Sequence, residues 1–155
     1  MKVKRLILLV LIIIWAVLVF GLSGQNGTES SGLSRKIVEF FTNNEEIIDC
    51  VEPYVRKLAH FSEYGLGGML FILLFSTYKW TDRKMMTISI SLGIWYASMD
   101  EIHQLMVDGR HGSIFDVYLD SLGFITGVCG MLAILKIKEM LNDKNKKIVK
   151  RVKNG

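Results

Sequence analysis

Long stretches of this 155-residue sequence lack charge or nearly lack it. No Lys, Arg, Asp or Glu lies in Leu6–Leu22, and three later stretches, 58–78, 85–106 and 113–137, carry only a few ionisable side chains each. A helix needs about 20 mainly apolar residues to cross a bilayer. The pattern argues against a soluble core and predicts an all-α integral membrane four-helix bundle. The expected spans are residues 6–22, 58–78, 86–106 and 114–136.

Proline and cysteine are also scarce. The one proline, Pro53, would suit the first turn of the second span, where its missing N–H costs nothing. The two cysteines, Cys50 and Cys129, fall at different depths and are not expected to form a disulfide. Internal repeats and low-complexity segments are absent from the sequence, so residues 1–155 are interpreted as a single membrane domain.

Lys and Arg residues are unevenly distributed. Fourteen of the 19 precede the first span, lie between the second and third, or follow residue 135. Because positive residues remain in the cytoplasm, both termini are predicted to be cytoplasmic, with an extracytoplasmic segment at 23–56 and a basic cytoplasmic tail at 137–155. The net charge of +4 then reflects topology, and no nucleic-acid partner is expected.

The first apolar stretch has a second interpretation. Lys2, Lys4 and Arg5 before an apolar run are also typical of a secretory signal peptide. The run is longer than the roughly 7–15 residues of a signal core, which favours an uncleaved helix.

The segment after the first span is polar at its beginning. Ser, Gly and Asn are dense in residues 23–32 and predict a loop. A short amphipathic helix at the membrane surface is expected next. Its apolar positions are Leu33, Ile37, Phe40 and Phe41. Asn44 is expected to cap a second short helix that ends before Pro53.

The ionisable residues within the spans share one leaflet. A charge at the centre of a membrane helix costs about 2.5–3.5 kcal/mol on insertion scales. Several ionisable residues within the spans therefore indicate a shared polar site. They are His60 and Glu63 in the second span, Asp100, Glu101 and His103 in the third, and Asp116 and Asp120 in the fourth. With the predicted topology, all seven lie in the outer half of the membrane. This predicts a polar pocket open to the outside.

Helical spacing places these residues on faces that can converge. Lys57, His60, Glu63 and Tyr64 share one face of the second span. Asp100, His103 and Gln104 share a face of the third, with Glu101 offset. Asp116 and Asp120 are one turn apart in the fourth. Gly123 and Gly127 continue that face as Gly-x-x-x-Gly, which permits close contact between helices.

The residue types suggest acid–base chemistry on an anionic ligand. A His beside a carboxylate is a plausible general base, and Lys57 and Arg110 suit a phosphate or carboxylate. The candidate catalytic residues are His60, Glu63, Asp100, His103 and Asp120. The candidate ligand-binding residues are Lys57, Tyr64, Glu101, Gln104, Arg110 and Asp116. The expected ligand is an anionic lipid headgroup or a lipid-linked cell-wall precursor.

Other interpretations remain open at this point. No Ser has a signature that would make it a nucleophile, so binding without catalysis fits equally well, and a purely structural network is a third possibility. His60-x-x-Glu63 and Asp100-x-x-His103 resemble the paired motifs of di-metal bundles. Nearby Lys57 and Arg110 are poor neighbours for a cation, so no metal or other cofactor is expected. A bound divalent metal is the alternative interpretation. Transport is disfavoured because the cytoplasmic halves of the spans lack ionisable groups.

Three linked motifs resemble the signatures of the VanZ-like family. They are Arg56–Gly67, Asp100–Gln104, and Gly109–Val117 followed by Asp120, Gly123 and Gly127. Ser23 and Gln25, followed by Ser30, Ser31 and Ser34, are similar to the stretch after the first helix of the family. The resemblance covers roughly residues 6–135 and adds Ser23 and Gln25 to the ligand-binding candidates. Many family members have Pro where this chain has Asp108.

The resemblance implies a four-helix protein of the bacterial cytoplasmic membrane. Family members are similar to a protein associated with low-level teicoplanin resistance. The family therefore suggests a phenotype, glycopeptide susceptibility, rather than a reaction. An outward-facing site near cell-wall precursors is consistent with such a role.

Overall fold

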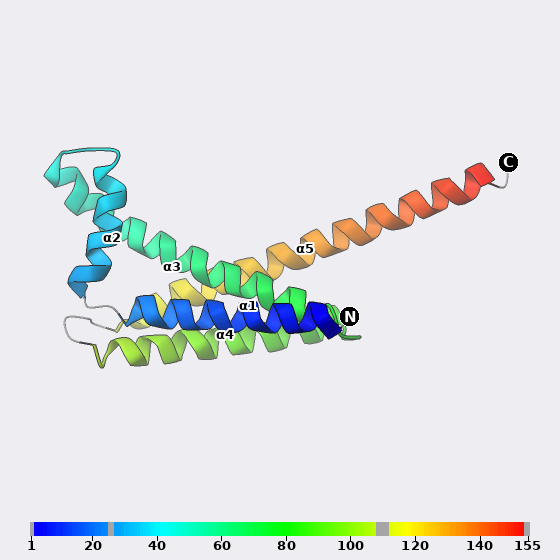
Figure 1. Ribbon diagram of the computed structural model, residues 1–155, viewed down its shortest axis with the longest axis horizontal. Coiled ribbons are helices and arrows are strands. Elements are labelled where there is room, and N and C mark those ends of the chain that lie inside the picture. The colour runs from blue at the N-terminus through cyan, green and yellow to red at the C-terminus, as the bar shows by residue number, and fades with distance from the viewer. Residues whose placement is uncertain (1, 25–26, 108–111, 154–155) are drawn as a thin grey trace.

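The computed structural model describes residues 2–24, 27–107 and 112–153, which form five α-helices and no strand (Figure 1). The helices are α1 (Lys2–Ser23), α2 (Gly27–Glu39), α3 (Glu45–Phe75), α4 (Asp82–Gln104) and α5 (Ile114–Lys153). The predicted all-α fold class is therefore confirmed.

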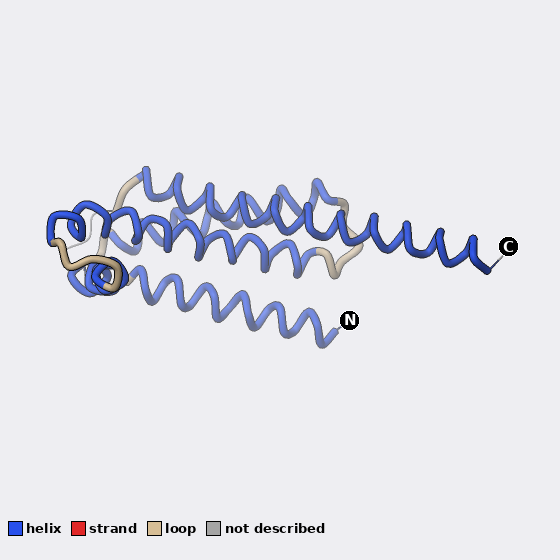
Figure 2. The backbone as a smooth tube through the Cα atoms, turned by 90° about the horizontal axis from the view of Figure 1, so that it is seen from above, coloured by secondary structure: helices blue, strands red, loops and turns tan. Residues whose placement is uncertain are grey.

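Four of the helices lie side by side and alternate in direction. α1 and α4 run one way and α3 and α5 the other, so the start of α1 and the end of α5 point to the same side of the molecule (Figures 1 and 2). α3 and α5 share the largest interface, and α2 packs along α3. This alternation brings the end of α1, the end of α4 and the start of α5 together.

Three helices are long and apolar enough to cross a membrane. They are α1, α3 and the Ile114–Val149 part of α5. α1 is apolar on all sides and leaves side chains such as Ile13 and Val17 exposed, which suits contact with lipid. The predicted third span, 86–106, corresponds to α4, which is not among the three. Its Ser, Thr and Gly residues and its terminal charges lower its hydropathy.

The core lies between α1, α3, α4 and α5. Trp15 of α1 is at its centre, with ring contacts to Tyr64, Phe71, Tyr96 and Phe124 at centroid distances of 5.1–6.2 Å. Aromatic pairs at such distances contribute about 0.5–1.5 kcal/mol each beyond the area that they bury. The aromatic cluster therefore fixes how α3, α4 and α5 pack around α1.

Close packing of α3 against α5 depends on glycine. A Cβ atom at Gly127 would collide with backbone atoms of Gly65, and one at Gly123 would collide with the backbone of Phe61. A Cβ at Gly68 would meet the backbone of Phe124. The predicted role of Gly123 and Gly127 in close helix contact is confirmed. Such contact lets polar groups on the two helices face each other across a short distance.

The outer segment differs from its prediction in two ways. α2 begins at Gly27 within the expected loop and ends at Glu39, which leaves Phe40 and Phe41 beyond the helix. The second short helix is not separate, because α3 runs unbroken from Glu45 and contains Pro53 in its interior. Packing against α2 supports this first part of α3, and such tertiary contacts can outweigh the cost of one proline.

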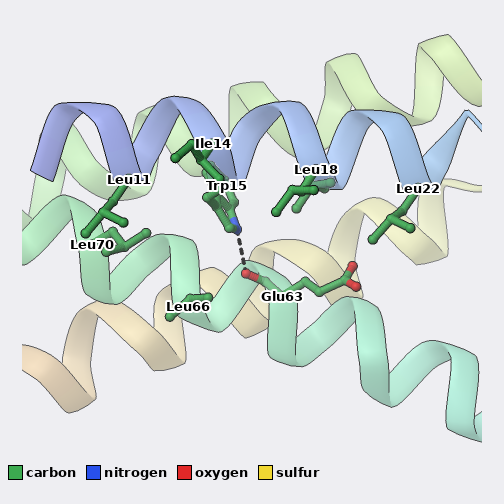
Figure 3. A pocket seen from close by; sticks show the side chains of 9 residues that line it. Leu11, Ile14, Trp15, Leu18, Leu22, Glu63, Leu66 and Leu70 are labelled. Atoms are coloured by element: carbon green, nitrogen blue, oxygen red, sulfur yellow. Dashed lines mark hydrogen bonds between the residues drawn. The ribbon is translucent and has the colours of Figure 1, made fainter. Parts of the chain in front are cut away.

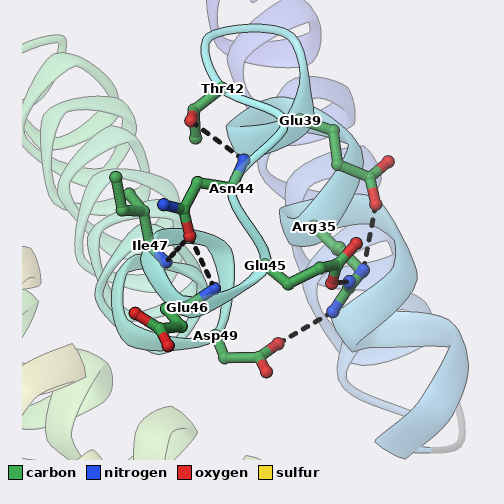
Figure 4. A network of polar contacts seen from close by, with 8 residues as sticks. All are labelled: Arg35, Glu39, Thr42, Asn44, Glu45, Glu46, Ile47 and Asp49. Carbon is green, nitrogen blue, oxygen red and sulfur yellow. Dashed lines mark hydrogen bonds and ion pairs between the residues drawn. The ribbon is translucent and has the colours of Figure 1, made fainter.

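A network of ion pairs ties α2 to the start of α3 (Figure 4). The Arg35 guanidinium contacts Glu39 and Asp49 at 2.9 Å each, and also contacts Glu45. These carboxylates raise the pKa of Arg35 above its ordinary value. The Asn44 side chain accepts hydrogen bonds from the Glu46 and Ile47 backbone N–H groups at 3.0 and 3.4 Å. The predicted cap at Asn44 is confirmed.

The predicted basic tail, 137–155, is an extension of a helix as far as the structure describes it. α5 continues without a break to Lys153 and projects beyond the other helices (Figure 1). The sequence between Gly130 and Lys153 has no Gly or Pro and is rich in Lys, Leu and Met, which favour helix. The helix therefore continues past residue 136, the expected end of the fourth span.

Polar contacts also join the helices at the side where α1 begins. The Arg5 Nη2 atom donates to the Thr77 carbonyl at 2.6 Å, and its guanidinium lies 4.1 Å from the centre of the Tyr78 ring. Lys136 of α5 pairs with Asp82 of α4 at 2.7 Å. We call this side the basic end. Its contacts hold α1, the α3–α4 connection and α5 in register.

Candidate functional site

The opposite side of the helices, which we call the polar end, gathers most of the predicted site residues. They come from the end of α1 (Ser23), the middle of α3 (Lys57, His60, Glu63 and Tyr64), the end of α4 (Asp100, Glu101, His103 and Gln104) and the start of α5 (Asp116 and Asp120). These segments are distant in sequence and meet because neighbouring helices alternate in direction. Gln25 and Arg110 lie outside the described residues.

Asp100 is at the centre of the polar end and is fully buried, with 0% of its surface exposed. The Gln104 Nε2 atom donates to Asp100 Oδ2 at 3.4 Å and to Ser23 Oγ at 2.8 Å. The buried Tyr64 hydroxyl faces the same carboxyl group without reaching hydrogen-bond geometry. His60 is close enough to interact with Asp100 electrostatically. Residues of α1, α3 and α4 therefore contribute to the surroundings of one carboxyl group.

Asp120 is the second buried carboxyl group, with 1% of its surface exposed. It interacts electrostatically with Asp100, Glu101, Asp116 and Glu63. Like charges repel strongly where water is scarce, so this cluster favours a partner that donates hydrogen bonds or carries positive charge. Within residues 2–24, 27–107 and 112–153, neither Asp120 Oδ2 nor Asp100 Oδ1 has a hydrogen-bond partner.

Lys57 lies at the rim of the polar end. Its Nζ atom is 3.9 Å from Asp116 Oδ1 and 4.8 Å from the centre of the Phe115 ring. The Lys57 side chain is 45% exposed, and exposed ion pairs of this length contribute little. An anionic ligand can therefore replace Asp116 as the partner of the Lys57 ammonium group at a small cost in free energy.

Glu101 has a structural contact. Its Oε2 atom accepts a hydrogen bond from the Ser113 backbone N–H at 2.8 Å, and the Ser113 hydroxyl accepts one from the Phe115 N–H at 3.1 Å. Glu101 thus fixes the start of α5 beside the end of α4. The sequence placed Glu101 off the polar face of its helix, yet it is buried because α5 begins against it.

His103 and Glu63 lie toward α1. The His103 ring stacks on Phe20 with centroids 4.0 Å apart and planes inclined by 26°. The backbone carbonyl of Glu63 accepts a hydrogen bond from the Trp15 indole N–H at 2.7 Å. These two contacts attach α1 to α4 and α3 at the depth of the buried carboxyl groups.

Sequence reasoning missed the partners that α1 and α5 supply. Phe20 stacks on His103, the Trp15 indole binds the Glu63 carbonyl and Phe115 lies under Lys57. One signal was available: Trp15, Val19 and Ser23 recur every four residues, which places Ser23 on the buried face of α1. Nothing in the sequence alone shows which neighbouring helix that face meets.

The arrangement can support proton transfer. Two buried carboxyl groups with a His and a Tyr nearby can hold and exchange protons with a bound hydroxyl or amine. In the described part of the chain, no three His, Cys, Asp or Glu side chains are placed to hold a metal ion together. The geometry therefore favours hydrogen-bonding chemistry at the carboxyl groups and charge pairing at Lys57.

Comparison with known proteins gives one match. A model of the family described as VanZ/LLP1 matches residues 8–136. No curated protein and no solved structure matches the chain.

Proposed function

The chain belongs to the VanZ/LLP1 family, as its motifs indicated, and on that premise we propose that its polar end acts on an anionic envelope lipid or a lipid-linked cell-wall precursor. The three apolar helices and the family match indicate a membrane protein. The proposal places the chain in the bacterial cytoplasmic membrane as a single domain, with the polar end at the outer face.

The proposed topology has four spanning helices and two cytoplasmic termini. α4 is included as a span because it lies alongside α1, α3 and α5 over a similar length (Figure 2). The distribution of Lys and Arg supports a cytoplasmic basic end. Residues 23–56, including α2, then lie outside, and the extension of α5 from residue 137 lies in the cytoplasm.

One observation carries the proposed function: a partly exposed Lys57 pairs with Asp116, one helical turn before Asp120, and Asp100 and Asp120 are buried and incompletely hydrogen-bonded. The lysine suits the phosphate of a lipid at the rim. The acidic interior repels a phosphate and suits the hydroxyl or amine groups of the same headgroup. A ligand that is anionic at one point and rich in hydrogen-bond donors at another matches both regions.

Within this proposal, Asp100 and Asp120 transfer protons to and from the headgroup, and His60, Glu63 and His103 assist them. Tyr64, Gln104 and Ser23 hold the ligand or orient Asp100. Asp116 competes with the ligand for Lys57. Gln25 and Arg110 stay predicted ligand-binding residues. Altered teicoplanin susceptibility would follow if the ligand is a precursor near the target of the antibiotic.

The test is a mass-spectrometric comparison of envelope lipids and cell-wall precursors. Cells making the wild type are compared with cells making Asp100→Asn, an isosteric change that removes the charge. Asp143→Asn, on the exposed extension of α5, is the matched control. We expect a lipid or precursor species that depends on the wild type and on the control but disappears with Asp100→Asn. Identical profiles in all three, at equal expression, would refute catalysis.

Binding without catalysis is the second candidate, and the exposed Lys57 at the rim, which suits an anionic group without any reaction, favours it. Under this alternative the lipid profiles are equal, yet the purified wild type retains an anionic lipid that a Lys57→Gln variant loses. Lipid retention therefore separates a binding protein from an enzyme.

A further inference from the structure

A cleft of about 420 Å³ lies between α1 and α3, away from the interior of the polar end (Figure 3). Apolar side chains form nearly all of its lining, and Glu63 is the one ionisable residue among the nine that line it. The Trp15 indole reaches across the cleft to the Glu63 carbonyl at 2.7 Å (Figure 3). Other lining residues include Leu11, Ile14, Leu18, Leu22 and Leu66.

The cleft reaches the polar end at Glu63. This residue lines the cleft, and its carboxylate lies toward Leu22 (Figure 3). Glu63 also interacts electrostatically with the buried Asp100 and Asp120. A molecule bound at the polar end can therefore extend an apolar portion along the cleft.

The shape of the cleft decides between its possible occupants. It runs beside α1 from Leu11 to Leu22, roughly 16 Å at 1.5 Å per residue. Its volume of about 420 Å³ then gives a mean cross-section of roughly 26 Å² over that length. This long, narrow and apolar shape suits an extended hydrocarbon chain.

We propose that the α1–α3 cleft binds one hydrocarbon chain of the lipid whose headgroup occupies the polar end. This inference rests on the proposed function and adds that the protein binds the tail of the lipid as well as its headgroup. It makes chain length a determinant of affinity, because each buried CH₂ group contributes to binding. A soluble headgroup analogue would lack this contribution.

The first test is native mass spectrometry of the full chain with phosphatidylglycerol carrying long or short acyl chains. Leu18→Trp and Leu66→Trp fill the cleft, whereas Val17→Trp adds the same bulk to an exposed neighbouring position of α1. We expect both filling variants to lose at least tenfold in affinity for the long-chain lipid and to bind the short-chain lipid like the wild type. Val17→Trp should match the wild type with both lipids.

The outcomes separate the cleft from the headgroup site. Wild-type affinity of both filling variants for the long-chain lipid would overturn the cleft inference alone. Equal wild-type binding of phosphatidylglycerol and phosphatidylcholine would instead refute the proposed preference for an anionic headgroup. If filling the cleft converts a dimer into a monomer, the occupant is a second copy and the inference is wrong.

A second measurement needs no substitution in the cleft. In a Trp80→Phe/Trp95→Phe protein, the remaining indole, Trp15, lines the cleft. Phosphatidylglycerol brominated on its acyl chains should quench Trp15 fluorescence at a low mole fraction, and unlabelled phosphatidylglycerol should compete. Trp15 emission that is insensitive to the brominated chains, or quenched only in proportion to their bulk concentration, would contradict a specific site.

Discussion

The two ends of the helix bundle use their polar groups differently. At the basic end, Arg5 is bound by Thr77 and Tyr78, and Lys136 is bound by Asp82. At the polar end, Asp100 and Asp120 are buried, and within the described ranges each has a carboxyl oxygen without a hydrogen-bond partner. Both ends carry charge on the same set of helices, yet only one satisfies it internally.

This difference separates a structural role from a functional one. Buried polar groups are normally hydrogen-bonded, because leaving one unsatisfied costs about 1–3 kcal/mol. Pairing of Arg5 stabilises the basic end, whereas the incompletely hydrogen-bonded Asp120 leaves a site for a ligand at the polar end. Removing the charge of Arg5 should therefore lower stability, and removing the charge of Asp120 should lower function.

The largest effect is expected where α3 touches α5. Gly127→Ala would place a methyl group against the backbone of Gly65, which cannot move aside, and should destabilise the protein by about 3 kcal/mol. Gly130→Ala, on the same helix but with open space around it, should have little effect. Thermal unfolding in detergent measures both. Equal melting temperatures for the two variants would show that the helices do not meet as described.

A smaller loss of stability is expected from Arg5→Ala at the basic end. The change removes two hydrogen bonds to Thr77 and the contact with the Tyr78 ring, worth about 1–2 kcal/mol together. Lys4→Ala, at an exposed neighbouring position, is the control. Melting curves at equal detergent concentration should separate the two variants. An unchanged curve for Arg5→Ala would contradict a structural role for the basic end.

Asp120→Asn should change stability by less than about 1 kcal/mol and in the stabilising direction, because it relieves repulsion among carboxylates. The same variant should lose the lipid or precursor change expected of the wild type. Melting and mass spectrometry on one preparation give both results. Marked destabilisation with retained function would assign Asp120 to a structural network.

The smallest effect is expected from Lys136→Ala. Its ion pair with Asp82 is largely exposed, and exposed pairs contribute little and weaken with salt. We expect no measurable change in melting temperature at physiological ionic strength. A clear loss that disappears at 1 M salt would show that this pair matters more than its exposure indicates.

The sequence was sufficient to predict the all-α fold class and the end of the helices at which most of the polar candidates gather. Hydropathy indicated the apolar helices, and the positions of Asp100 and Asp120 near helix ends placed them in one layer. The unbroken α3 could not be predicted, because Pro53 normally favours a helix start and its tolerance depends on packing against α2. The contacts of Glu101 with Ser113 and of His103 with Phe20 depend on neighbours that spacing within one helix does not reveal.

The central claim is that the polar end binds an anionic headgroup, and its most direct test is a binding isotherm in nanodiscs. Phosphatidylglycerol binding is measured for the wild type, for Lys57→Gln and for Lys36→Gln, a control on α2. We predict that the wild type and the control prefer phosphatidylglycerol over phosphatidylcholine, and that Lys57→Gln binds phosphatidylglycerol about tenfold more weakly, a loss of about 1.4 kcal/mol. Equal affinity for both lipids in all three proteins would contradict the claim.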